Sequence, residues 1–252
     1  MPGLPDVRQG ERCRISRREI DFGARAFRIR LDRAEPKDLR VHTAAAHGRR
    51  LREQCRRLRD WAIECEVRSG FLHCLCDPAQ RTSRWEREDP LLVRGAEVID
   101  AARRAETPRG RARHLQSLVG LGLGLTPAGD DFIVGYLAAS PLSDRARADR
   151  RLLVEALPSL ARTRTTDVSA RMLEAACRNE FAEPVVELVE SLARTRNGLF
   201  RAAEDLLALG GTSGADTLAG VLFAASSCHP TRQTRPRSRT GRTGPTGRRS
   251  EL

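Results

Sequence analysis

Lysine is almost absent from this chain of 252 residues. Of its 45 basic residues only Lys37 is a lysine, and the others are arginines. A phosphate-binding loop of the G-x-x-x-x-G-K-[ST] type needs a lysine next to its glycines. Lys37 does not stand in that pattern. The sequence therefore excludes a lysine-anchored nucleotide loop in the region after residue 91.

Aromatic residues are also scarce, at 4% of the chain, which is too few for an obvious platform on which bases could stack. The formal net charge of +12 is misleading in this respect, because residues 229–252 contain seven arginines and one glutamate and supply half of it. That segment has no apolar periodicity, so we expect a disordered Arg-rich tail. Weak RNA binding by charge alone is the alternative, and no specific nucleic-acid partner is expected.

Long apolar runs are missing too. The longest, around residues 118–139, is interrupted by Pro127 and by the Asp130–Asp131 pair, so no membrane span or membrane partner is expected. The first eight residues lack the apolar stretch of a secretory leader. The seven cysteines, an odd number, are expected to remain thiols in a reducing cytoplasm.

The most informative segment is 120–132, which reads G-L-G-L-G-L-T-P-A-G-D-D-F. Thr126 suits the N-cap of a helix and Pro127 its first position, where a missing N–H costs nothing. Asp130 and Asp131 would then lie in the first turn, near the positive end of the helix dipole.

Three glycines of this segment, Gly122, Gly124 and Gly129, are expected to leave backbone N–H groups uncovered and to allow positive φ. Both properties are required of a loop that binds an anion.

A similar pattern recurs at residues 210–220, G-G-T-S-G-A-D-T-L-A-G. Here Asp216 is followed four residues later by Gly220, as Asp131 is by Gly135. Spacing of four puts each glycine on the helical face of its aspartate, where it permits close helix contact. Ser213 also precedes Asp216 by three residues, which fits a capping box. Two capped helices with small-residue crossings would explain either motif alone, but the pair favours one site at two facing helix starts.

The N-terminal part is less clear. Residues 22–31 alternate as in a half-exposed strand, 39–67 have helix-compatible spacing, and 71–76 are predicted to form a buried strand. His73, Cys74 and Cys76 lack the second ligand pair of a structural zinc site, so no metal site is predicted there.

From residue 91 onward, helical periodicity dominates. Helices are predicted at 96–105, 111–119, 132–139, 150–161, 168–177, 181–193, 199–209 and 217–225. The predicted fold class is α+β, with a small β-containing N-terminal region followed by a compact orthogonal α-helical bundle. The predicted domains are a mixed α/β region at 1–90, a helical domain at 91–228 and the tail at 229–252.

Both motifs resemble those of the AllH-type subunit family of oxamate carbamoyltransferase. That family carries a G-L-G-P-G-L-T-P-S-G-D-D loop and a later S-G-A-D-T-L-A-G segment, and the resemblance extends over roughly residues 91–227. This chain differs at Leu123, where the family usually has proline, and at Ala128, where it usually has serine. The resemblance implies a subunit that moves a carbamoyl group between oxamate and phosphate in purine (allantoin) catabolism.

No β-α-β alternation surrounds the first loop, and no histidine stands beside either motif, which argues against a dinucleotide site and a Ser–His hydrolase. Three helix starts rich in Gly, Thr and Ser remain. Their N–H groups attract anions, while their aspartates suit the NH₂ of a carbamoyl ligand. The candidate catalytic residues are Asp130, Asp131 and Asp216. The candidate ligand-binding residues are Gly122, Gly124, Thr126, Gly129, Thr165, Thr166, Thr212, Ser213 and Gly214.

The expected partners are a small carbamoyl or carboxylate ligand and other carbamoyltransferase subunits. Two alternatives stay open at this point. One is a non-catalytic assembly or regulatory subunit that binds a small anion. The other is a metal-dependent hydrolase that uses the Asp pair with Mg²⁺; apart from that ion, no cofactor is predicted.

Overall fold

The computed structural model describes residues 13–22, 28–43, 48–65, 70–75, 90–194 and 198–226. The chain divides into two compact units, Met1–Arg40 and Val41–Leu252. The first contains a small antiparallel sheet and the second contains the helices, so the fold is α+β as predicted. The tail predicted at residues 229–252 lies outside the described residues, and the domain limits predicted at residues 90 and 228 stay predictions.

The sheet of the first unit has the strand order β1-β2-β3, with β1 at Arg14–Ile15, β2 at Glu19–Asp21 and β3 at Arg28–Arg30. Its register aligns Ile15 with Ile20 and Ile20 with Ile29, which places three isoleucines in one row. The strand predicted over 22–31 is found in part, since β3 covers its C-terminal half and residues 23–27 lie outside the described residues.

The second unit contains the following described helices. They are α1 (Arg49–Glu64), α2 (Gly70–His73), α4 (Pro90–Arg104), α5 (Pro108–Gln116), α6 (Ala128–Ala139), α7 (Asp144–Arg164), α8 (Asp167–Cys177), α9 (Glu183–Arg194), α10 (Leu199–Leu207) and α11 (Ser213–Ser226), with the 3-10 turn η2 (Ser140–Leu142) after α6. Every helix predicted after residue 91 is present. Helices on both sides of residue 90 share one hydrophobic core.

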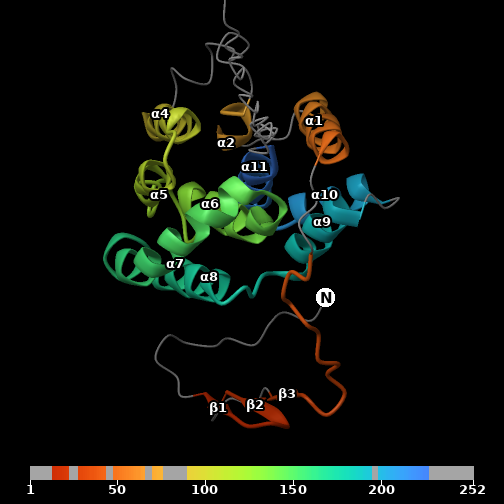
Figure 1. Cartoon of the computed structure of the whole chain (residues 1–252). Helices are drawn as coiled ribbons and strands as arrows, with labels where there is room; N and C mark the ends of the chain where they lie inside the picture. The colour runs from red at the N-terminus through yellow and green to blue at the C-terminus, as the bar shows by residue number, and fades with distance from the viewer. Residues whose placement is uncertain are drawn as a thin grey trace, which may run out of the picture. The chain divides into compact units, whose positions relative to one another are not determined.

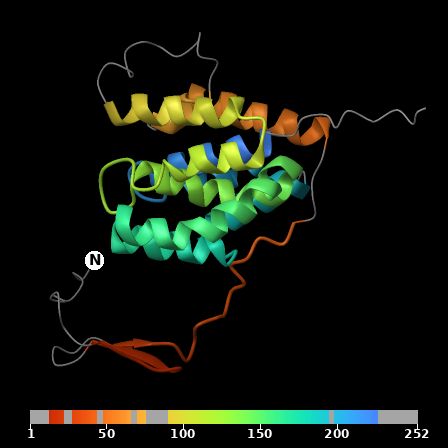
Figure 2. The ribbon, with the colours of Figure 1, turned by 60° about the vertical axis from the view of Figure 1, so that its left-hand side comes forward.

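Helices α6 and α11 form the centre of this unit (Figure 1). Figure 1 shows α4, α5, α7 and α8 on one side of the pair and α1, α9 and α10 on the other. In the turned view of Figure 2, the central pair lies between α1 and α4 above and α7 and α8 below. Both central helices are apolar on all faces and carry acidic residues only in their first turns, as expected of buried helices.

The two central helices cross at their glycines. A Cβ on Gly135 would lie 2.0 Å from the carbonyl oxygen of Thr217, and one on Gly220 would lie 2.0 Å from that of Phe132. No side chain fits at such distances. The close helix contact predicted from the spacing of aspartate and glycine is therefore confirmed, and it brings the first turns of both helices together.

The prediction of a strand at 71–76 was wrong, because Phe71 and Leu72 lie in the short helix α2. Phe71, Leu72 and Cys74 are all buried, and Cys76 lies outside the described residues. A short apolar run does not distinguish a buried helical turn from a buried strand. The helical turn is favoured here because the N–H of Phe71 donates a hydrogen bond to the Asp216 side chain on α11.

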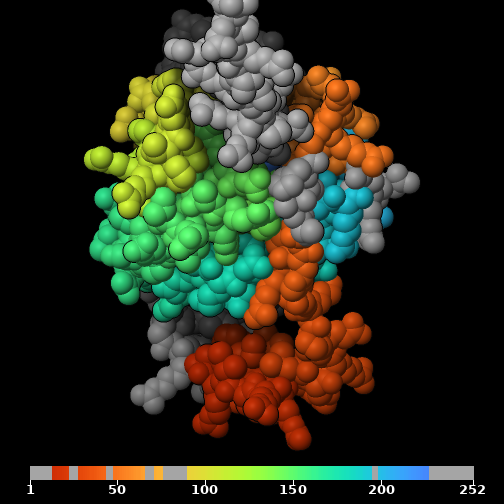
Figure 3. Space-filling view, in the orientation of Figure 1, coloured from red at the N-terminus to blue at the C-terminus, as the bar shows by residue number. Residues whose placement is uncertain are grey.

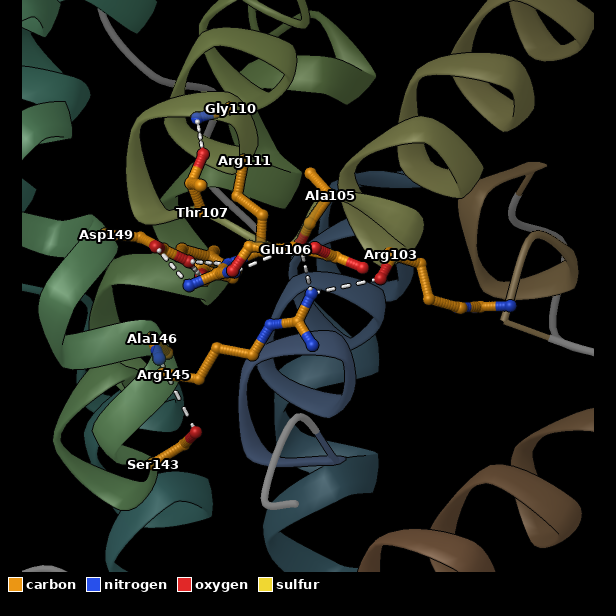
Figure 4. A network of polar contacts seen from close by, with 11 residues as sticks. Arg103, Ala105, Glu106, Thr107, Gly110, Arg111, Ser143, Arg145, Ala146 and Asp149 are labelled. Atoms are coloured by element: carbon orange, nitrogen blue, oxygen red, sulfur yellow. Dashed lines mark hydrogen bonds and ion pairs between the residues drawn. The ribbon is translucent and has the colours of Figure 1, made fainter. Parts of the chain in front are cut away.

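A buried polar network joins α5, α6 and α7. Arg111 on α5 forms an ion pair of 2.8 Å with Asp149 on α7, and the hydroxyl of Tyr136 on α6 donates to the same carboxylate at 2.6 Å. Figure 4 shows Arg145 next to this pair, reaching the backbone at Arg103 and Ala105. The network fixes α7 against the central helix.

Candidate functional site

The loop before α6 owes its shape to glycines with positive φ. Gly120, Gly122 and Gly124 have φ values of 77°, 129° and 92°, a region that other residues rarely adopt. In the part of the chain that the structure describes, the N–H groups from Gly122 to Thr126 donate no hydrogen bond. The loop therefore presents a run of backbone donors, as the sequence predicted for Gly122 and Gly124.

Gly129 differs from that prediction, since it lies inside α6 without a positive φ. Its N–H donates to the carbonyl of Leu121 at 2.8 Å, and a Cβ there would lie 2.0 Å from the carbonyl oxygen of Leu118. Glycine is needed at this position because the backbone of the preceding turn packs directly against α6. The N–H of Gly129 is thus used inside the loop and helps to shape it.

The N-cap of α6 is Pro127 and not Thr126. The carbonyl of Pro127 accepts hydrogen bonds from the N–H groups of Asp130 and Asp131 at 2.9 and 3.2 Å. The hydroxyl of Thr126 instead lies 2.8 Å from that of Ser213 at the start of α11. A tertiary partner has displaced the predicted cap, and this contact joins the two motifs directly.

The second motif begins α11 in the same way. Ser213 is the first residue of the helix, and the carbonyl of Thr212 accepts from the N–H of Asp216 at 3.0 Å. The capping box predicted for Ser213 and Asp216 is not formed, since Ser213 pairs with Thr126. Gly214 packs against the backbone of Leu206, so it does not line an open space.

A third helix start meets the same loop. Thr166 is the N-cap of α8, where its hydroxyl accepts from the N–H of Ser169 at 3.1 Å. The same hydroxyl donates to the carbonyl oxygen of Leu125 in the glycine loop. The structure therefore brings together all three helix starts that the sequence singled out.

Asp130 connects two of these starts and has its hydrogen bonds satisfied. One carboxylate oxygen accepts from the N–H of Gly120 at 2.8 Å. The other accepts from the hydroxyls of Thr165 and Ser169, the latter at 2.7 Å. These contacts hold the loop, the end of α7 and the start of α8 together.

Asp216 is also buried, at 2% exposure, and it binds the start of α2 through the N–H of Phe71 at 3.4 Å. The sequence contained no signal for this contact, because the two residues are 145 positions apart. The structure therefore gives Asp216, like Asp130, an internal partner.

Asp131 differs from both neighbours. Its side chain is 1% exposed, and neither carboxylate oxygen forms a hydrogen bond with any described residue. The hydroxyls of Ser213 and Thr126 lie near its carboxylate, but they pair with each other and neither has the geometry of a hydrogen bond to Asp131. A buried oxygen without a partner loses its hydration at a cost of about 1–3 kcal/mol, more if it is charged, so its presence requires an explanation.

Burial raises the pKa of Asp131 to about 7, and the negative charges of Asp216 and Asp130 act in the same direction. The hydroxyls of Ser213 and Thr126 oppose this shift without cancelling it. Asp131 therefore changes its protonation state near neutral pH, whereas an ordinary aspartate does so near 3.8. Carboxyls shifted in this way are concentrated at functional sites.

This pKa predicts an unusual effect of pH on stability. Between about pH 4 and pH 7 the folded chain keeps a proton on Asp131 that the unfolded chain has lost, so the contribution of Asp131 to stability falls as pH rises. We expect Asp131→Asn, which cannot ionise, to exceed the wild type in free energy of unfolding at pH 8 by at least about 1 kcal/mol. Urea unfolding at pH 4 and pH 8 measures this.

The control for that experiment is Asp167→Asn, which changes an exposed aspartate in the first turn of α8. It should show no gain in stability at pH 8. A lower stability of Asp131→Asn at pH 8 would mean that Asp131 supports the fold in its charged form.

The residues at the site do not fit a Mg²⁺ ion. No group of three His, Cys, Asp or Glu side chains converges as a metal site within the described ranges. Both oxygens of Asp130 accept from N–H or O–H donors, and Asp216 accepts from Phe71. These contacts leave Asp131 as the one carboxylate of the predicted three without an internal partner.

Sequence reasoning missed two residues of this site, Ser169 and Gly120. Ser169 is fully buried and bonds to Asp130, and its position three residues after the N-cap Thr166 is the signal that could have indicated it. A Cβ at Gly120 would lie 1.9 Å from the carbonyl oxygen of Arg164.

Fold and site together define an α+β protein in which three Gly/Thr/Ser-rich helix starts surround a buried, unpartnered carboxylate. The family model described as oxamate carbamoyltransferase subunit AllH matches residues 118–225. This segment contains the glycine loop, α6, the start of α8 and the second motif, so the resemblance predicted from the motifs is confirmed over it. No solved structure matches the chain. Within the described residues, no helix has the length and apolar character needed to cross a bilayer.

Proposed function

We propose that this chain is the ligand-binding subunit of a carbamoyltransferase, acting on oxamate or its carbamoyl derivative oxalurate in purine catabolism. The observation that carries the proposal is Asp131, a buried carboxylate without a partner at the meeting point of two helix starts. The AllH match over residues 118–225 supports the same reaction class. A buried carboxylate without a hydrogen-bond partner costs free energy of folding, and a ligand that supplies hydrogen-bond donors would satisfy it.

The chemistry of the surrounding groups matches a carbamoyl ligand. Its NH₂ group donates a hydrogen bond that the ionised Asp131 accepts. Its carboxylate or phosphate oxygens accept hydrogen bonds from the free N–H groups of the loop from Gly122 to Thr126. The nearby N-termini of three helices favour the negative charge of these oxygens. Asp131 is buried, and the nearby hydroxyls of Thr126 and Ser213 pair with each other, so we infer that the ligand reaches Asp131 when that hydrogen bond opens. Binding of this kind positions the carbamoyl group and contributes to transfer by orientation.

The first test is a calorimetric titration of oxalurate and of carbamoyl phosphate into the full chain. We expect Asp131→Asn to weaken binding by about tenfold or more, the loss of one charge-assisted hydrogen bond. The control Asp205→Asn removes the same charge from an exposed position of α10, outside the three helix starts, and should leave affinity unchanged. Equal affinities for the wild type and Asp131→Asn would refute the role of Asp131.

The pKa of Asp131 adds a pH dependence to this binding. The ionised carboxylate only accepts hydrogen bonds, so it suits the NH₂ donor of a carbamoyl group better than the protonated form, which carries an O–H donor. The affinity for the ligand should therefore rise as pH increases through about 7. We expect affinity at pH 8 to exceed that at pH 6 by about fivefold or more in the wild type. Asp131→Asn should show no such rise, and a parallel rise in both proteins would assign it to another group.

The isolated chain is expected to bind its ligand without turnover. Among the described site residues, Asp131 is the one candidate for proton transfer, and the matched family is described as a subunit. The assay is carbamoyl phosphate formation from oxalurate and phosphate, with and without candidate partner subunits. Robust turnover by the chain alone would indicate a self-contained enzyme. Inactivity in both mixtures with ligand still bound would favour the second candidate, a non-catalytic binding subunit. The replacement of the family serine by Ala128 in the loop supports that candidate.

A further inference from the structure

A second site candidate is a cleft of about 550 Å³ formed by α1, α4 and the C-terminal half of α11. Four arginines line it, three from α1 and one from α4, and no acidic side chain of the described residues does so. They are Arg52, Arg56, Arg59 and Arg103. Figure 1 shows α1 and α4 on either side of α11, and α1 forms part of the molecular surface in Figure 3. The volume lies within the range of about 300–1,000 Å³ of small-molecule sites.

Three of these arginines, Arg56, Arg59 and Arg103, form ion pairs with acidic neighbours on their own helices. Arg59 contacts Asp60 at 2.7 Å and Arg103 contacts Asp100 at 3.6 Å, and these pairs are partly exposed. Such pairs contribute only about 0–1 kcal/mol each. A ligand anion between the guanidinium groups can therefore replace or join these partners at little cost.

One wall of the cleft is apolar. Leu75, Leu222 and Phe223 contribute to it, and the guanidinium carbon of Arg103 lies 5.9 Å from the centre of the Phe223 ring. Arg103 also donates to the carbonyl of Cys74 at 3.3 Å, which fixes its plane. A fixed guanidinium stacks on planar groups as well as binding oxyanions. The cleft thus offers both a charged and a planar contact.

The charge of the C-terminal segment argues against that segment as the occupant. Helix α11 ends at Ser226, which lines the cleft. The sequence that follows, residues 229–252, contains seven arginines and one glutamate, so its charge has the same sign as that of the cleft. Like charges at close range repel, and the C-terminal segment is therefore a poor ligand for these arginines.

We propose that this cleft binds an anion with a planar, apolar body, the class that includes nucleoside phosphates and aromatic carboxylates. The site is separate from the one around Asp131. Ser226 is ten residues beyond Asp216, which corresponds to about 15 Å along the helix axis. The two sites therefore lie at different ends of α11, and each can fail without the other.

The experiment is a set of calorimetric titrations of the full chain at low ionic strength with adenosine monophosphate, benzoate, adenosine and inorganic phosphate. At least one of the two aromatic anions should bind more tightly than both adenosine, which lacks the charge, and phosphate, which lacks the planar body. Comparison of adenosine monophosphate with benzoate distinguishes a nucleotide from an aromatic carboxylate. Added salt should weaken the binding.

Two matched double variants test the location. Arg52→Gln/Arg56→Gln should weaken binding of the aromatic anion by about tenfold or more. Arg49→Gln/Arg50→Gln removes the same charge from exposed positions of the same helix outside the cleft, and should change affinity by less than about twofold. Asp131→Asn should bind the aromatic anion as the wild type does, which separates this result from the carbamoyl site.

Equal weakening in both double variants would show attraction to the charge of the helix in general and would overturn the proposal. Binding of the two aromatic anions no tighter than that of phosphate or adenosine would also overturn it.

Discussion

Replacing Asp149 by alanine is expected to lower the free energy of unfolding by about 3–5 kcal/mol. Arg111 contacts both oxygens of this carboxylate, at 2.8 and 2.9 Å, and the side chains are 6% and 0% exposed. Tyr136 donates a third hydrogen bond at 2.6 Å, and burial together with Asp149 raises the pKa of this phenol well above its ordinary value. Removal of Asp149 leaves a buried guanidinium without its counter-charge and a buried hydroxyl without its acceptor.

Urea unfolding measures this loss of stability, and two further variants show what causes it. Asp144→Ala removes an exposed ion pair with Arg147, 3.1 Å long on the same helix, and should cost at most about 1 kcal/mol. The double variant Arg111→Met/Asp149→Leu should recover part of the loss, since no unpaired charge remains. A cost below about 1 kcal/mol for Asp149→Ala would mean that water reaches the network shown in Figure 4.

Gly220→Ala is expected to destabilise the chain by about 3 kcal/mol or more, the upper end for overpacking. The new Cβ would lie 2.0 Å from the carbonyl oxygen of Phe132 and 2.8 Å from the backbone nitrogen of Tyr136. These atoms belong to the backbone of α6, so no side-chain rotation relieves the overlap. In an exposed helix the same change would stabilise by about 1 kcal/mol, and the reversed sign is therefore diagnostic of the crossing.

Gly211→Ala is the control, because a Cβ at Gly211 has no neighbour within 4 Å. Its effect should stay within about 0.5 kcal/mol. Thermal and urea unfolding of both variants suffices for the comparison. Moving α6 from α11 would also displace the helix start that carries Asp131 from the start of α11, so Gly220→Ala should weaken oxalurate binding in addition. A stability close to that of the wild type would show that the two helices can separate without loss.

The sequence could predict the helices because their apolar residues repeat at helical spacing and their ends carry local signals. It could also predict that Asp131 and Gly135, like Asp216 and Gly220, mark a helix crossing. These features depend on residues within one or two turns of one another. Residues 71–73 were mispredicted because a short apolar run does not distinguish a buried helical turn from a buried strand, and the contact of Phe71 with Asp216 is distant in the sequence.

The sequence by itself determined the α+β class, the two glycine-and-aspartate motifs and the resemblance that the match at residues 118–225 confirms. Only the tertiary structure decided which of three aspartates lacks a partner. Asp130 and Asp216 obtain donors from segments 10 to 145 residues away, whereas Asp131 is buried with none. The physical reason is that the desolvation of a carboxylate, and hence its pKa, depends on what packs around it in three dimensions, and adjacent aspartates with the same local sequence signals can differ completely in that respect.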